Sequence, residues 1–279
     1  MITNQVNKRN AVKSLWSITV KSLATAAILA PIFIGNNSAK AVTLDFESGL
    51  PSDVLYVQDF STGLVFGEFM PDIQTLSDGN NVLRLSEDQT VAEGGASTTT
   101  LLYPNIIAEN VMVSALLNPA GLEDGDEGTN DRILLYARIN LVTEDTYVFG
   151  IDFETNQIFL REVIEGDIEN IFVEEFVELD QNTPYFAEFR VIGNQLTGRL
   201  FDQTTEQVYE VSFVDTENPL SAGITGIATN ISDSFLPGEE DNNNVTIDNF
   251  SVSSVPEPTS VLGLLAIGAI GVGSMLKHK

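Results

Sequence analysis

Short segments with the character of β-strands, separated by turn residues, fill residues 42–253 and restrict the folds open to this chain. Residues 132–141, 146–152, 157–164 and 184–192 are rich in β-branched, aromatic and alternating apolar positions. The dipeptide Gly193-Asn194 has the residue types that a two-residue hairpin turn prefers. No segment shows the period of an amphipathic helix. The pattern predicts one all-β antiparallel sandwich, with further strands at 42–47, 54–57, 64–69, 82–86, 98–103, 110–117, 169–177, 195–201, 206–213, 223–228 and 245–252.

The first 41 residues have the charge order of an export signal. They carry basic but no acidic residues, and an apolar run extends from Leu23 to Ile34. Ala39 and Ala41 then form a small-x-small cleavage site around Lys40. We expect a signal peptide over residues 1–41, recognised by the Sec export machinery, and a mature chain that begins at Val42.

The C-terminal residues, 254–279, have the features of a second targeting signal. Pro256, Glu257 and Pro258 precede an uncharged apolar segment, residues 259–276, and a basic end. A transmembrane helix needs roughly 17–25 apolar residues, so this segment is predicted to be one. The basic end is expected to stay cytoplasmic, which leaves the body outside the inner membrane. The alternative interpretation of this segment is a plain C-terminal membrane anchor, which needs only these features.

The order of proline motif, apolar helix and basic end resembles a PEP-CTERM sorting signal over residues 254–279. The resemblance implies processing near Pro256, Glu257 and Pro258 by a membrane-embedded exosortase, in a bacterium that makes exopolysaccharide. On this view the protein is tethered to the inner membrane before processing and then lies at the cell surface or in the extracellular matrix.

The charge balance of the body restricts the classes of partner that it can bind. All 40 acidic residues of the chain lie between Asp45 and Glu257, where only arginines, six in number, carry positive charge. Phosphate binding needs clustered basic residues, so a nucleic-acid partner is not expected. The acidic surface is consistent with cation binding, or with a well-solvated, self-repelling surface.

Residue types absent from the body exclude several chemistries. The chain has no cysteine, and its one histidine is His278, beyond the apolar tail. Thiol chemistry, cysteine-based zinc sites and catalysis that uses histidine as the base are therefore excluded for the body. A pair of carboxylates could still hydrolyse glycosides. The segment Glu178-Leu179-Asp180 is similar to part of a glucanase motif, but the third acid is missing and Thr183 occupies its place.

Leu44–Gly49 and Ile247–Val252 resemble the paired terminal strands of concanavalin A-like lectin and glucanase jelly rolls. The order of the middle segments also agrees with that family, at residues 132–140, 147–150, 185–194 and 196–202. The resemblance implies a jelly-roll body at 42–253, a structural ion where the terminal strands meet, and a groove open to a glycan. The body tyrosines are expected mainly in the core rather than as sugar platforms.

Calcium is the predicted cofactor, because it takes six to eight oxygen ligands and the body is rich in carboxylates. One predicted site joins Asp45 or Glu47 to Asp248. A second uses Asp124, Asp126 and Asn130 in an acidic, glycine-rich loop. For both sites the alternative is a solvated acidic turn.

The sequence as a whole predicts an exported, non-catalytic surface or matrix protein that binds or associates with extracellular polysaccharide. The alternative is a carboxylate-dependent glycoside hydrolase of the glucanase type. The two differ in whether a glycan is only bound or also cleaved.

Overall fold

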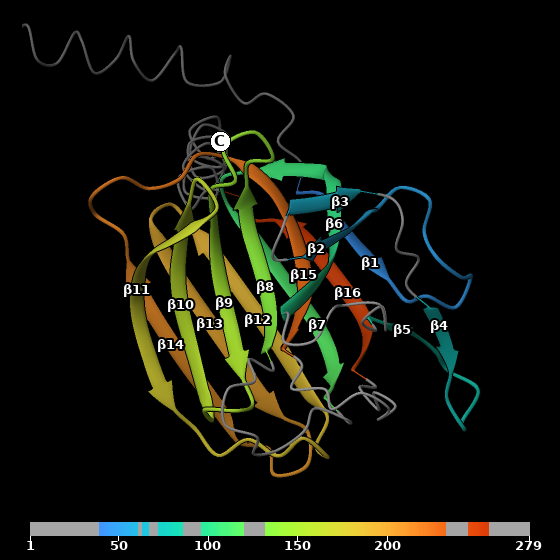
Figure 1. Ribbon diagram of the computed structural model, residues 1–279. Helices are drawn as coiled ribbons and strands as arrows, with labels where there is room; N and C mark the ends of the chain where they lie inside the picture. The colour runs from blue at the N-terminus through green and yellow to red at the C-terminus, as the bar shows by residue number, and fades with distance from the viewer. Residues whose placement is uncertain are drawn as a thin grey trace, which may run out of the picture. The chain divides into compact units, whose positions relative to one another are not determined.

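Two antiparallel β-sheets stacked face to face make up the body of the protein (Figure 1). The computed structural model describes residues 39–60, 63–66, 72–85, 96–119, 132–232 and 245–256. These residues belong to one compact unit, Ala39–Glu257. No helix occurs among them, as the sequence predicted.

One sheet, called sheet A here, has the strand order β14-β13-β12-β7-β16-β5-β4, and β1 also pairs with β16. Its central strands alternate buried and exposed positions, so one face lies on the core and the other faces outward. Its strands are β1 (Ala41–Leu44), β4 (Asp72–Thr75), β5 (Asn81–Arg84), β7 (Val111–Asn118), β12 (Tyr185–Ile192), β13 (Gln195–Asp202), β14 (Val208–Val214) and β16 (Thr246–Ser254).

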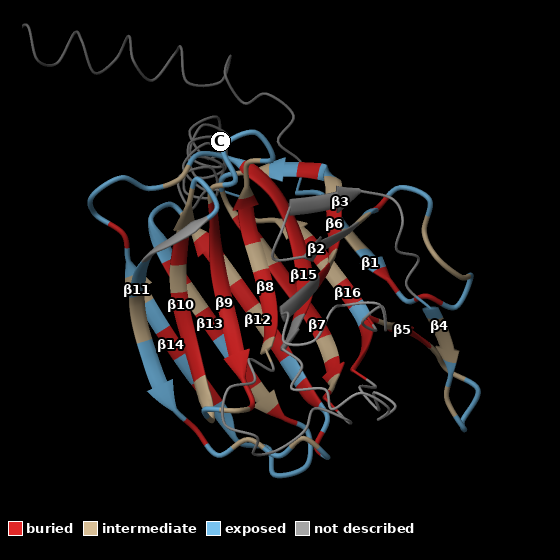
Figure 2. Ribbon diagram, viewed as in Figure 1, coloured by how far each residue is buried: buried red, intermediate tan, exposed pale blue. Residues whose placement is uncertain are grey.

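The other sheet, sheet B, has the order β11-β10-β9-β8-β15-β6-β2-β3. Strand β9 is buried along its whole length and lies near the middle of the red region in Figure 2. The strands of sheet B are β2 (Leu55–Phe60), β3 (Gly63–Phe66), β6 (Ala96–Ala108), β8 (Arg132–Ile139), β9 (Thr146–Asp152), β10 (Gln157–Ile164), β11 (Asp167–Phe176) and β15 (Gly223–Ser232).

The core fills the space between the sheets. Every second residue of a strand points inward, so Phe149 and Ile151 of β9 meet Ala187 and Phe189 of β12 in one cluster. The Phe149 and Phe189 rings are 6.2 Å apart, centroid to centroid. Burial of these apolar side chains is the main force that holds the sheets together.

The two ends of the body pair with each other. Strand β1 runs antiparallel to the end of β16, with Leu44 opposite Phe250 and Ala41 opposite Ser253. The predicted pairing of the terminal strands is therefore confirmed. It extends one residue further back, because the Ser254 N–H donates to the Lys40 carbonyl over 2.8 Å.

Most predicted strands occur in the structure, although several ends differ by a few residues. The strand predicted at 42–47 ends at Leu44, the one at 54–57 continues to Phe60, and the one at 223–228 continues to Ser232. Residues 67–69 of the predicted strand 64–69 lie outside the described part.

Two further differences concern β4 and β6. Strand β4 was missed, because Asp72–Thr75 is short and largely exposed. Strand β6 was predicted to end before Pro104, but it continues to Ala108. Its pairing with β2 ends at Leu102, and its pairing with β15 is irregular beyond Tyr103. A proline without an N–H is tolerated where no ladder bond is needed.

Candidate functional site

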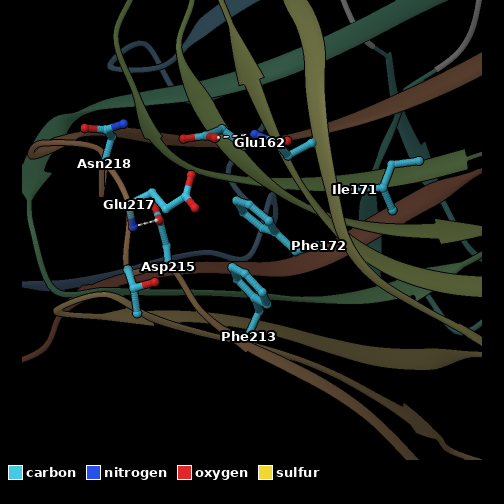
Figure 3. A pocket seen from close by; sticks show the side chains of 9 residues that line it. Glu162, Ile171, Phe172, Phe213, Asp215, Glu217 and Asn218 are labelled. Atoms are coloured by element: carbon cyan, nitrogen blue, oxygen red, sulfur yellow. Dashed lines mark hydrogen bonds between the residues drawn. The ribbon is translucent and has the colours of Figure 1, made fainter.

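A pocket of about 330 Å³ lies where β11, an edge strand of sheet B, and β14, an edge strand of sheet A, come side by side (Figures 1 and 3). One wall comes from β10 and β11 of sheet B. The other comes from β14 of sheet A and the loop that follows it. The lining residues are Glu162, Asn170, Ile171, Phe172, Phe213, Asp215, Thr216, Glu217 and Asn218.

Two stacked phenylalanines form the apolar side of the pocket. The rings of Phe172 and Phe213 are nearly parallel, at 7°, with centroids 4.2 Å apart, and Figure 3 shows them one above the other. The register of β10 and β11 shifts next to Phe172, leaving it as an extra residue in β11. This bulge turns Phe172 toward the core, where its ring lies 6.3 Å from that of Tyr147.

Carboxylates form the polar side of the pocket. Glu162 follows Ile158 and Leu160 on the inward face of β10, and it is only 8% exposed. It accepts a hydrogen bond of 3.3 Å from the Asn170 side-chain amide. Asp215 begins the loop after β14, is 5% exposed, and accepts the Glu217 N–H over 3.1 Å. Glu217 itself is an exposed residue at the rim of the pocket.

Contacts from the core hold the loop that carries Asp215. The buried Tyr147 hydroxyl donates to the Asp215 carboxylate and accepts the Leu220 N–H over 2.8 Å. Burial, together with the bond to Asp215, raises the pKa of Tyr147 well above its ordinary value. The loop is therefore fixed at two points by one phenol.

Arg138 of β8 also holds the loop that carries Asp215, through a hydrogen bond to the Leu220 carbonyl. Its guanidinium is 5.8 Å from the centre of the Tyr147 ring and donates to the carbonyls of Leu220, Glu109 and Gly193. Arg138 is 3% exposed and has a φ of 59°, next to an irregular pairing of β8 with β15. Burial lowers the pKa of Arg138, which nearby Tyr147, Glu109 and Asp215 partly offset.

The pocket combines hydrogen-bond acceptors, amide groups and an aromatic wall. Its nine lining residues include three acids and no base. Carboxylates accept hydrogen bonds from hydroxyl groups, and aromatic side chains pack on apolar C–H surfaces. This combination suits a polyhydroxylated ligand the size of a few sugar rings, and it disfavours an anion.

The first predicted calcium site lies elsewhere, where β1 and β16 meet the β4–β5 turn. The Asp248 carboxylate accepts the Asn80 amide at 3.1 Å and the Asn249 N–H at 2.7 Å. Glu47 accepts the Asn81 N–H at 3.2 Å. The neighbours Asn80 and Asn81 thus bring Glu47 and Asp248 into one region.

These carboxylates are a poor fit to calcium as they stand. Asp45 accepts the Glu47 N–H over 3.2 Å, so its oxygen serves a local turn. Within the described ranges, no group of three or more Asp, Glu, His or Cys side chains is placed to hold a metal. Calcium at Asp45, Glu47 and Asp248 stays a prediction.

Several other predicted residues lie outside the described part of the chain. They are Asp124, Asp126 and Asn130 of the second calcium site, the apolar segment 259–276, and residues Glu257 and Pro258 of the sorting motif. Ala39 and Ala41 of the expected cleavage site are described and exposed, directly before and at the start of β1. In the described part, no helix is long and apolar enough to cross a membrane.

The acidic segment that is similar to a glucanase motif forms a turn rather than a strand face. Asp180 accepts the Asn182 N–H over 2.8 Å, and its own N–H donates to the Tyr185 hydroxyl. The Glu178 carbonyl accepts from the Tyr209 hydroxyl. Both tyrosines are buried, as expected, and anchor the turn.

The acids of the pocket were not singled out from the sequence. Glu162 and Asp215 are 53 positions apart in number and belong to different sheets, so no local motif joins them. The one local signal was Glu162, a charged residue on the inward face of β10, where it follows the apolar residues Ile158 and Leu160.

Comparisons with known structures show the fold of the body. The basic lectin of winged bean, solved with Tn-antigen, aligns with a TM-score of 0.51 at 11% identity, covering 78% of this chain and 99% of the lectin. The acidic winged bean lectin, solved with methyl-α-D-galactose, aligns with 0.51 at 13%, covering 79% and 100%. Carbohydrate-binding module CBM66 of Bacillus subtilis gives 0.44 at 12%, covering 66% and 92%. The body has the concanavalin A-like jelly-roll fold of the legume lectins.

The tail is identified by its sequence. Residues 254–277 match the PEP-CTERM protein-sorting motif, which confirms the resemblance seen in the sequence. The motif indicates an exported protein sorted to the cell envelope. No curated protein sequence matches the chain.

Proposed function

We propose that this protein is an exported, non-catalytic component of the cell surface or extracellular matrix that associates with polysaccharide through the β11–β14 pocket. The observation that carries the proposal is the pocket, where Phe172 and Phe213 face a rim of carboxylates and amides. Its position on a lectin-like sandwich with a sorting tail supports the same reading.

The charge of the pocket defines the sugar it takes. Asp215 and Glu217 accept hydrogen bonds and repel anions, so the ligand is a neutral glycan that offers hydroxyl donors. Asn218 at the exposed rim supplies both a donor and an acceptor. The exosortase and Sec machinery act on the tail and the leader, before the body meets its glycan.

The test is retention of the purified protein on neutral polysaccharide from producing cells. We expect Glu217→Gln combined with Asn218→Ala to weaken binding by about tenfold, since two polar contacts are lost. Both residues are exposed, so the fold is unaffected. Glu178→Gln, an exposed acid in the β11–β12 turn, is the matched control. Equal retention of all three proteins would remove the pocket from the proposal.

The same pocket provides the test of the hydrolase alternative. A retaining glycosidase needs two carboxyl groups about 5–5.5 Å apart, one with a raised pKa. Both carboxylate oxygens of Asp215 instead accept hydrogen bonds within the protein, one from the Tyr147 hydroxyl and one from the Glu217 N–H. Release of reducing ends that Glu162→Gln abolishes would establish the enzyme and overturn the non-catalytic proposal.

A further inference from the structure

The outward face of sheet B carries a second cluster, separate from the pocket. Ile158 and Leu160 of β10 point into the core, so Phe159 and Arg161 between and after them point outward. Arg132 of β8 lies on the same outward face, since Ile133 next to it is in the core. We call Arg132, Phe159 and Arg161 the outer arginine cluster.

Phe159 organises the cluster. Its ring lies across Gly150 of β9, where an added Cβ would come within 2.0 Å of the ring. The guanidinium of Arg161 is 5.2 Å from the ring centre, and that of Arg132 is 5.9 Å from it. Glycine at position 150 therefore lets one aromatic ring bring two cations together.

Arg132 is held in place by an ion pair. Its Nε donates to Asp152, the residue directly opposite on β9, over 2.6 Å. Asp152 also accepts the Thr155 N–H over 2.9 Å, and it is 2% exposed. The side chain of Arg132 is 24% exposed, so it is fixed yet accessible.

Arg161 lacks this compensation. Its Nε is buried, and no hydrogen-bond partner for it occurs among the described residues. Burial lowers the pKa of Arg161, and the nearby charge of Arg132 lowers it further, while Tyr136 and Asp152 act in the opposite direction. A buried donor without a partner is costly. Arg161 as a whole is only partly buried, so its guanidinium group can serve as a donor to an acceptor from outside the fold.

We propose that the outer arginine cluster binds the carboxylate of an acidic sugar residue, a uronate within a polysaccharide. Arginine presents donors in a planar fork that matches a carboxylate. The body repels polyanions at long range, but that repulsion is screened beyond about 8 Å at physiological salt. Contact with Arg161 therefore decides binding. This site extends polysaccharide association to a second surface and does not rest on the pocket.

The experiment measures binding of tri-galacturonate to the purified full chain at physiological salt. The neutral methyl ester of the same trisaccharide is the matched ligand, because it keeps the hydroxyl groups and removes the charge. We expect the acid to bind and the ester to bind at least about tenfold more weakly. Equal affinity for the two would overturn the proposal, since it would show that charge is not recognised.

Variants locate the site. Arg161→Gln should weaken tri-galacturonate binding about tenfold or more, while Arg199→Gln, an exposed arginine on sheet A, should leave it unchanged. Thermal melts confirm that each variant is folded. The pocket variant Glu217→Gln should bind the acid normally, so failure here and failure of the pocket are distinguishable. Full affinity in a folded Arg161→Gln protein would refute the assignment, as would acid binding that depends on a second copy of the chain.

Discussion

Arg138 is the residue whose loss should be felt most widely. One buried guanidinium binds the carbonyls of three separate connections, at Glu109, Gly193 and Leu220. We predict that Arg138→Lys lowers the free energy of unfolding by about 2–3 kcal/mol, because an ammonium group cannot reproduce the planar fork. Urea denaturation measures it. Arg190→Lys, on a partly exposed arginine, should change stability by at most about 0.5 kcal/mol; similar losses in both variants would contradict the role given to Arg138.

Asp248 is the residue that tests calcium. Its two oxygens accept N–H groups from Asn80 and Asn249, so Asp248→Asn should cost about 1–2 kcal/mol even without metal. We also propose that millimolar calcium raises the melting temperature of the wild type more than equal magnesium does, since an ion bound only to the folded state stabilises it. The shift should be absent in Asp248→Asn. Equal melting in both ions would remove calcium from this position.

At the scale of single elements, close packing of β9 against β13 requires a glycine. A Cβ at Gly198 would lie 2.3 Å from the Phe149 ring, which is fully buried. Gly198→Ala should therefore cost about 1–3 kcal/mol by overpacking. Gly79→Ala is the comparison, because Gly79 has a φ of +91° but no atom lies within 4 Å of an added Cβ. That variant introduces backbone strain without a packing clash. Chemical denaturation of Gly198→Ala and Gly79→Ala measures the loss of stability in each variant. A Gly198→Ala protein as stable as the wild type would show that the two sheets separate easily.

Two tyrosines with buried hydroxyl groups should make the fold sensitive to alkali. Burial raises the pKa of Tyr56 to about 12, and burial with the Asp215 bond raises that of Tyr147 further. Unfolded tyrosines ionise near pH 10, so their contribution is complete below pH 10 and is lost as the pH rises toward the folded values. We predict falling stability above about pH 10, and a shallower fall in Tyr147→Phe. The same pH dependence in that variant would exclude Tyr147 as a cause.

The strands were predictable from the sequence where local pattern determines structure. Residues 146–152 and 157–164 were placed correctly because their apolar content and flanking turns are local. The bulge that turns Phe172 inward was not, since it depends on pairing with β10. The pocket was also beyond local pattern, because Glu162 and Asp215 meet only when the two sheets stack. The sorting motif needed no fold and was found directly.

At the scale of the whole molecule, an acidic lectin-like body is joined to a tail that directs it to the cell envelope. The pocket lies between β11 and β14, and the outer arginine cluster lies on the outward face of sheet B. The two proposals assign opposite kinds of sugar to these sites. A neutral glycan suits the first and an acidic one the second. Together the two proposals assign the protein a structural task, in which it joins two chains of a mixed matrix.

The most direct test of polysaccharide association uses polysaccharide isolated from producing cells. The purified protein is incubated with it, the polymer is sedimented, and both bound protein and newly formed reducing ends are measured. We predict that the protein sediments with the polymer and that the number of reducing ends does not change. Protein that stays in the supernatant, or reducing ends that increase with time, would contradict the account.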